Sequence, residues 1–313
     1  MPPYRRPAAP LLLLASVLAL AGCGSGAGGD ASDTSDTGGS PGDDRISIVT
    51  STNVFGDIAA RVGGQEVDVT SIVDGPSQDP HSYEATVQDK LTVSKADLVI
   101  DNGGGYDPFL ARLAEDTDRS VLSAVTVSGL DGFGQDGGPD ANEHVWYSLP
   151  AMENLAGAVA DELARLDEPN AEDYHRRAEA FAEELAPVRD RLDTLAADGG
   201  GGRVAVTEPV PVYLLEAAGL ENVTPGGFTE AIEEGTDVPV SAMEEMTTLV
   251  SSGSLAFLAY NNQTEGSQTE LVRSVAEDAD LPVLDFGETL PDGEDYVSWM
   301  SANTADIAAA LES

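Results

Sequence analysis

From residue 45 onward, short apolar runs alternate with segments whose apolar residues recur at helical spacing. This pattern predicts strands at residues 46–49, 67–73 and 97–101, with helices between them at 54–62 and 86–95. Thr86, followed three residues later by Asp89, has the pattern of a helix N-terminal capping box. Strands and helices that alternate at this spacing predict a parallel sheet covered by helices.

The longest helical pattern occupies residues 169–198, where Asn170 is the predicted N-cap and the glycines at 199–202 end the helix. Its apolar positions, three and four residues apart, are Tyr174, Ala178, Phe181, Leu185, Val188, Leu192 and Leu195. His175 falls one residue off this stripe and is predicted to be a surface residue. About 27 helical residues at ~1.5 Å each span roughly 40 Å, which is enough to connect two lobes.

The strand and helix pattern then resumes, with strands predicted at 203–207, 255–260 and 283–286 and helices at 210–218, from Ser267 and from Tyr296. Ser267 and Glu270 are predicted to form a second capping box. We therefore predict an α/β protein of two lobes, residues 45–168 and 199–313, each a mostly parallel sheet flanked by helices. One long rigid helix joins them. Residues 102–105, Asn-Gly-Gly-Gly, lack phosphate-loop spacing and predict a tight turn after a strand.

The first residues have the pattern of a secretory signal, because Arg5 and Arg6 precede an apolar run that ends in Leu-Ala-Gly-Cys. These last four residues resemble the lipobox of bacterial lipoproteins. That resemblance implies a signal peptide over residues 1–22, cleavage before Cys23 and lipidation of its thiol. Residues 23–44 consist of this cysteine and a run of Gly, Ser, Thr and Asp, which predicts a disordered tether.

Charge and cysteine content exclude several classes. Asp and Glu number 56 and Lys and Arg 15, for a net charge of −41, which argues against nucleic acid or an anionic membrane surface as a direct partner. Cys23 is the only cysteine, so the folded part has no disulfide, no cysteine nucleophile and no cysteine-based zinc site.

Metal-ligating side chains are few. Of three histidines, His81 follows the strand at 67–73, and His144 precedes a helix that begins near residue 150. Glu208, Asp285 and Glu288 lie at or just beyond later strands. In open α/β sheets ligands bind beyond the carboxyl ends of strands, and neutral imidazole is a common ligand for transition metals. The sequence therefore predicts a metal site that both lobes share.

An ordered series of motifs resembles the zinc/manganese solute-binding lipoproteins of bacterial ABC transporters, the cluster A-I metal-binding family. The series comprises DPHSYEAT at 79–86, ADLV at 96–99, NGGG at 102–105, EHVW at 143–146, VTEP at 206–209, TP at 224–225, EEG at 233–235 and YVSWM at 296–300. It covers roughly residues 45–313. The resemblance implies two α/β lobes bridged by a rigid helix, with one divalent metal ion held as cargo at their interface. It also implies delivery to an ABC permease and its ATPase at the extracytoplasmic face of the cell membrane.

The resemblance places His81, His144 and Glu208 at three ligand positions of the family. It places Glu288 at the fourth, and Asp285 is the alternative. Asp79 and Glu84 are candidate partners for the second ring nitrogen of His81. This chain departs from many zinc-binding members because residues 131–142 lack their long His/Asp-rich loop.

Two imidazoles and two carboxylates suit either Zn²⁺ or Mn²⁺, and a glutamate at position 208 favours Mn²⁺ slightly. We expect a monomer without enzymatic activity. Two alternatives stay open at this point. One is a surface adhesin or interaction lipoprotein with a structural metal, and the other is a secreted metallohydrolase, which needs an open coordination position and a general base.

Overall fold

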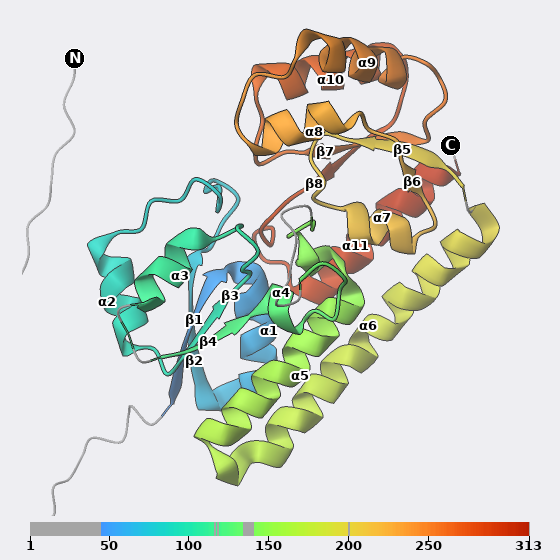
Figure 1. The fold of residues 1–313 in the computed structure, drawn as a ribbon. Helices are drawn as coiled ribbons and strands as arrows, with labels where there is room; N and C mark the ends of the chain where they lie inside the picture. The colour runs from blue at the N-terminus through green and yellow to red at the C-terminus, as the bar shows by residue number, and fades with distance from the viewer. Residues whose placement is uncertain (1–44, 116, 118, 134–140, 200, 313) are drawn as a thin grey trace, which may run out of the picture. The chain divides into compact units, whose positions relative to one another are not determined.

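The first four strands form one parallel sheet (Figure 1). The computed structural model describes residues 45–115, 117, 119–133, 141–199 and 201–312. Strands β1 (Ile46–Thr52), β2 (Val67–Val73), β3 (Leu98–Asp101) and β4 (Ser120–Ser123) pair in the order β2-β1-β3-β4, with every pair parallel. Parallel neighbours require crossover connections, and α1 (Asn53–Gly63), α2 (Val87–Lys95) and α3 (Pro108–Glu115) supply them. A short 3-10 turn, η1 (Gly64–Glu66), follows α1.

The second sheet repeats this topology. Strands β5 (Arg203–Val206), β6 (Glu221–Asn222), β7 (Phe257–Asn261) and β8 (Val283–Phe286) pair in the order β6-β5-β7-β8, all parallel. The helices between them are α7 (Val212–Ala217), α8 (Gly226–Glu233), α9 (Val240–Val250) and α10 (Ser267–Asp278). In each sheet the first and third strands are neighbours, so each sheet has a topological switch point where ligands commonly bind. The predicted α/β fold with two parallel sheets is confirmed.

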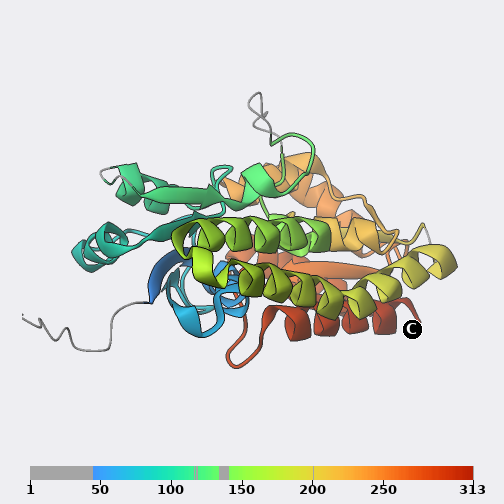
Figure 2. The same ribbon diagram turned by 90° about the horizontal axis from the view of Figure 1, so that it is seen from below.

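The long helix is α6 (Ala171–Gly199), and it packs on both halves of the fold (Figure 2). It contacts α1 and α5 (Leu149–Leu166) beside the first sheet, and α7 and α11 (Tyr296–Leu311) beside the second. The predicted apolar stripe is buried from Tyr174 to Leu192, and His175 is exposed as expected. The 29 residues of α6 correspond to about 44 Å. Before α6 the chain forms α4 (Ala124–Val127) and the 3-10 turns η2 (Val145–Tyr147) and η3 (Glu168–Asn170).

One hydrophobic cluster takes side chains from both sheets. It includes Ile100 of β3, Val206 of β5 and Phe181 of α6, all at most 2% exposed. The C-terminal helix α11 contributes Met300 and packs against α6 and α1. Because this core is continuous from one sheet to the other, the fold resists large changes in the angle between its halves.

The predicted capping box of Thr86 and Asp89 is present at the start of α2. The N-terminal ends of α10 and α6 differ from the sequence prediction. At α10 the N-cap is Gly266 rather than Ser267, and the Thr269 hydroxyl accepts the Gly266 N–H at 2.9 Å. Ser267 and Glu270 are therefore helical residues. At α6, Asn170 ends η3, and its side-chain amide donates to Asp167 at 2.7 Å.

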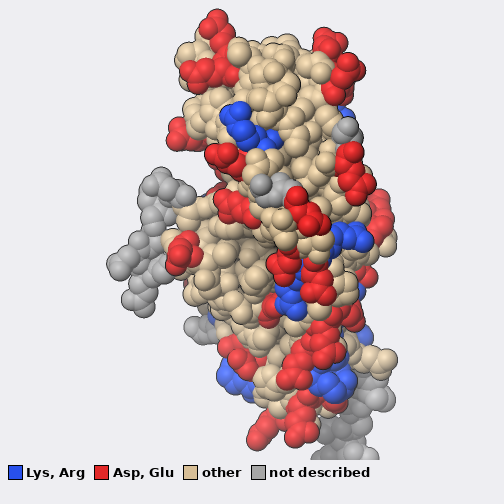
Figure 3. Space-filling view, turned by 90° about the vertical axis from the view of Figure 1, so that its right-hand side faces the viewer, with Lys and Arg blue, Asp and Glu red and all other residues tan. Residues whose placement is uncertain are grey.

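The surface is acidic, as the composition requires. Figure 3 shows Asp and Glu side chains spread over one face, with few Lys and Arg among them. No helix of the described part combines the length and apolar character needed to cross a bilayer. The predicted signal peptide, Cys23 and the tether lie outside the described residues, as do residues 134–140 of the 131–142 loop.

Candidate metal centre

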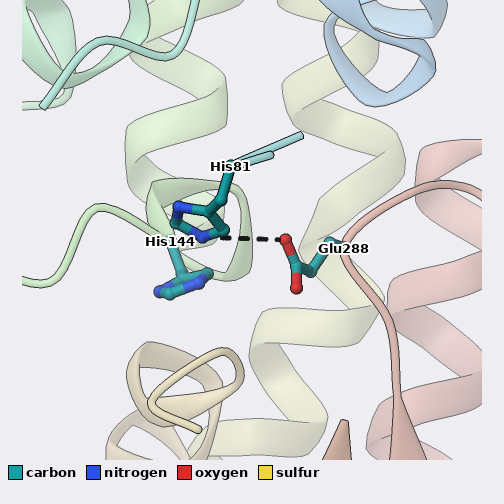
Figure 4. Close-up of side chains that lie close together, drawn as sticks. All are labelled: His81, His144 and Glu288. Atoms are coloured by element: carbon teal, nitrogen blue, oxygen red, sulfur yellow. Dashed lines mark ion pairs between the residues drawn. The ribbon is translucent and has the colours of Figure 1, made fainter. Parts of the chain in front are cut away.

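Three of the four predicted ligands converge between the two sheets. His81 lies in the loop after β2, His144 lies directly before η2, and Glu288 follows β8. Their ligand atoms lie within 4.8 Å of one another, and His81 Nε2 is 4.0 Å from Glu288 Oε2 (Figure 4). His144 and Glu288 are each 1% exposed, whereas His81 reaches solvent.

His144 presents one ring nitrogen with no partner. Its Nδ1 lies 2.7 Å from Asn142 Oδ1, an atom that only accepts, so Nδ1 carries the proton. Nε2 is buried and has no hydrogen-bond partner within the described structure. Burial, together with the neighbouring His81, lowers the pKa of His144 well below its usual value. The imidazole is therefore neutral and keeps a lone pair on Nε2, as metal coordination requires.

Asn142 also fixes His144 to the second half of the fold. Its Oδ1 accepts the His144 backbone N–H at 3.1 Å, and its Nδ2 donates to the Pro209 carbonyl at 2.9 Å. Tyr213 of α7 donates from its hydroxyl to the Asn142 carbonyl at 2.8 Å. The position of His144 thus depends on the turn that carries Glu208.

Both oxygens of Glu288 accept hydrogen bonds from buried donors. The Tyr106 hydroxyl donates to Oε2 at 3.0 Å, and Asn261 Nδ2 donates to Oε1 at 2.8 Å. Gln263 Oε1 accepts the backbone N–H of Glu288 and that of Thr289, which orients the loop. Burial raises the pKa of Glu288 to about 7, although these side-chain hydrogen bonds oppose the shift.

Glu208 follows β5 and is joined to Glu288 through Asn261. The Asn261 amide Nδ2 donates to Glu208 as well as to Glu288, and the Thr264 hydroxyl donates to Glu208 Oε1 at 2.6 Å. Glu208 is 6% exposed, and burial raises its pKa to about 7. It is not part of the group of ligand atoms that all lie within 4.8 Å of one another, so the structure brings together three of the four predicted ligands.

The alternative residues lie elsewhere. Asp285 is exposed, and its Oδ1 pairs with Arg273 Nη1 at 3.1 Å, so the structure does not bring it to the histidines. Asp79 accepts the His81 backbone N–H at 2.9 Å and the Ser82 hydroxyl at 2.7 Å, so it holds the loop rather than the imidazole. Glu84 is exposed and has no hydrogen bond within the described residues.

Tyr106, Asn142 and Asn261 hold the proposed ligands but are not among the residues predicted from the sequence. Asn261 is the last residue of β7, one position beyond the predicted strand, so the rule that polar residues follow strands would have found it. Tyr106 follows the glycine turn, where Asp107 accepts the backbone N–H groups of Asn102 and Gly103 at 2.7 and 2.9 Å. Gly103 has a φ of 76°, so the expected tight turn is present. The backbone N–H groups of this turn bind the carboxylate of Asp107.

A cleft of about 580 Å³ opens onto the site. Its lining includes the acidic side chains of Asp79, Glu208, Glu233, Glu234, Asp237 and Glu265, together with His81. A divalent cation that enters the cleft therefore meets negative charge before it reaches the buried ligands.

The chain matches a protein-family profile and several curated proteins. A profile of the family described as ZnuA, zinc-uptake complex component A, periplasmic, matches residues 48–310. The manganese-binding lipoprotein MntA of Halalkalibacterium halodurans is 28% identical, over 75% of each chain. The manganese ABC transporter substrate-binding lipoprotein PsaA of Streptococcus anginosus is 26% identical, over 96% of this chain and 97% of its own.

Solved structures share the fold. The periplasmic zinc binding protein TroA from Treponema pallidum has a TM-score of 0.70 at 20% identity, over 85% of this chain and 99% of that chain. The solute-binding protein FpvC from Pseudomonas aeruginosa, in complex with Mn²⁺, has a TM-score of 0.70 at 20% identity, over 86% and 98%. Because the family profile extends from β1 to α11, the chain belongs to the ZnuA family of periplasmic zinc-uptake components.

Proposed function

We propose that this protein is a solute-binding protein that captures one divalent transition metal ion between its two sheets and delivers it to an ABC importer. The observation that carries the proposal is the convergence of His81, His144 and Glu288 around the unpartnered Nε2 of His144. Buried polar atoms normally have partners, and a metal ion would be the missing partner of this nitrogen.

Four ligands are proposed: His81, His144, Glu208 and Glu288. Two ionised carboxylates balance the charge of a 2+ ion, so the occupied site carries no net charge despite its burial. Glu208 is bound to Glu288 through Asn261, and a small movement of its side chain toward the histidines would complete the set. In a tetrahedral geometry, four protein ligands leave no open position for a reacting water, and for this reason we propose no enzymatic activity.

The donor set accepts Mn²⁺ and Zn²⁺. Carboxylate oxygens match the hardness of Mn²⁺, whereas Zn²⁺ has the greater intrinsic affinity for most nitrogen and oxygen sites. Competition between the two ions, measured by titrating one against protein loaded with the other, determines which is the cargo. The named manganese transporters among the relatives support Mn²⁺ as the first ion to test.

The proposed partners follow from the family. They are an ABC permease and its ATPase, with the protein acting as a monomer at the extracytoplasmic face of the cell membrane. The named lipoproteins among the relatives support anchoring by a lipid on Cys23. Replacing Cys23 by Ala is expected to release the protein from the membrane fraction.

The ligand assignment is tested with a matched pair of acids. Saturating metal, at about 1,000 times Kd, is expected to stabilise the wild-type protein by about 4 kcal/mol. Glu288→Ala is expected to abolish the thermal shift, and Asp285→Ala to retain it. A wild-type protein with no shift for either Mn²⁺ or Zn²⁺ would contradict the proposed function. A shift that survives Glu288→Ala and is lost in Asp285→Ala would reverse the assignment.

A further inference from the structure

A second group of ligand atoms lies beside the proposed metal site. Glu143, His144 and Glu233 each offer one ligand atom, and these atoms lie within 4.8 Å of one another. Glu143 directly precedes His144, and Glu233 is the last residue of α8 beside the second sheet. Two carboxylates from opposite halves of the fold therefore meet at the imidazole that the proposed cargo site also uses.

Within the described residues, neither Glu143 nor Glu233 forms an ion pair with a lysine or an arginine. Two carboxylates this close repel each other, and a bound cation removes that repulsion. The group also contains an unpartnered buried atom. His144 is 1% exposed and its Nδ1 is hydrogen-bonded to Asn142, so the ring nitrogen that can bind a cation is Nε2, which has no partner.

The two groups differ in their access to solvent. Glu233 is exposed and lines the cleft together with His81 and Glu208, and Glu143 is half-buried. Glu288 is 1% exposed and lies behind them. A cation from solvent therefore reaches Glu233 before it reaches Glu288. His144 belongs to both groups, so a cation can exchange carboxylates while it keeps one imidazole.

We propose that Glu143, His144 and Glu233 form a loading site for the divalent metal ion. The ion binds there first, and then passes to His81, Glu208 and Glu288 with His144 as the common ligand; release follows the reverse path. This inference rests on the proposed function, and it adds a second, weaker metal site with a kinetic role.

Stopped-flow binding of Mn²⁺ and of Zn²⁺ tests the loading role. Trp146 serves as the reporter, because its ring centroid lies 5.1 Å from that of His144. Glu233→Gln is expected to lower the association and dissociation rate constants together by about tenfold, with little change in Kd. Glu234→Gln is the matched control, since it removes the same charge from the next residue of the same cleft. It is expected to slow association less than about twofold.

Direct binding is measured after the cargo site has been disabled. The His81→Ala/Glu288→Gln double variant is expected to retain weak Mn²⁺ binding, detected by electron paramagnetic resonance, and added Glu233→Gln to abolish it. Equal slowing by Glu233→Gln and Glu234→Gln, or no residual binding in the double variant, would overturn the loading site. Either result would rule out the loading site without affecting the proposed cargo site. A wild-type protein that binds neither metal would instead rule out the proposed function itself.

Discussion

The hydroxyl of Tyr106 donates a hydrogen bond to Glu288 Oε2 at 3.0 Å, and so connects the turn after β3 to the loop after β8. Tyr106 is fully buried, and its ring packs edge-on against His81, with centroids 4.7 Å apart. Burial and the adjacent Glu288 raise the pKa of Tyr106 well above its usual value, so the hydroxyl remains a donor. One side chain therefore orients a proposed ligand from each half of the fold.

Tyr106→Phe removes this donor and keeps the ring. Hydrogen bonds that orient metal ligands affect affinity by roughly 10- to 100-fold. We expect metal affinity, measured by isothermal titration calorimetry, to fall about tenfold. Tyr174→Phe is the matched control, because Tyr174 is also buried and its hydroxyl donates to a carboxylate, Asp167, in a different part of the molecule. Equal affinities for wild type and Tyr106→Phe would show that Glu288 needs no orientation by Tyr106.

Asn261→Asp replaces the amide between Glu208 and Glu288 by a third acid. Residue 261 is 3% exposed, so the new carboxylate is buried, lacks the amide's N–H donors and faces the carboxylates of Glu208 and Glu288. At pH 8 we expect the free energy of unfolding of the metal-free protein to fall by about 3 kcal/mol in urea denaturation. The deficit shrinks at pH 6, where the acids take up protons. Asn262→Asp, at the exposed next position, is expected to stay within about 0.5 kcal/mol of wild type.

Much of the fold could be predicted because single segments determine it. The stripe from Tyr174 to Leu192 requires only helical periodicity, and its buried side is the predicted one. The strand at Val67–Val73 and the cap at Thr86 likewise follow from local chemistry. The choice of Gly266 over Ser267 as the N-cap of α10 was missed, because Thr269 offers a competing hydroxyl to the Gly266 N–H.

The hydrogen-bonding partners of the proposed ligands could not be predicted, because they come from distant segments. Tyr106 and Glu288 are 182 residues apart in the sequence, and Asn261 is 53 residues from Glu208. No periodicity or spacing connects such pairs. Asp285 and Glu288 were hard to separate for a related reason, since both follow the same strand. Arg273 on α10 distinguishes them by binding Asp285 at the surface.

Phe181→Ala tests whether the two halves of the fold share one core. Phe181 is 2% exposed on α6, and its ring lies 5.8 Å from that of Tyr296 on α11. We expect a loss of about 3–5 kcal/mol in a single cooperative unfolding transition, measured by calorimetry. Glu179→Ala, at an exposed position of α6, is expected to change stability little. Two separate transitions, only one of them shifted, would indicate two independent cores.

The raised pKa values of Glu208 and Glu288 predict opposite pH dependence for the metal-free and metal-bound protein. Each pKa rises from 4.5 to about 7 on folding, so the folded state binds more protons between these values. Their contribution to stability is complete below pH 4.5 and is lost as the pH rises through 7. From pH 8 to pH 6.5 we expect the metal-free protein to gain about 1 kcal/mol, measured by urea denaturation with chelator present. Below pH 6.5 the lowered pKa of His144 opposes this gain.

The stabilisation that metal binding provides has the opposite pH dependence over the same interval, because the ion must displace the protons that the carboxylates hold. The stabilisation produced by Mn²⁺ or Zn²⁺ is therefore expected to shrink from pH 8 to pH 6.5. Asp101, whose pKa burial raises to about 7, changes metal-free stability in the same direction as the two ligands. Glu208→Gln isolates one ligand: its metal-free stability should depend less on pH than that of wild type. An unchanged slope would mean that Glu208 is already ionised throughout this range.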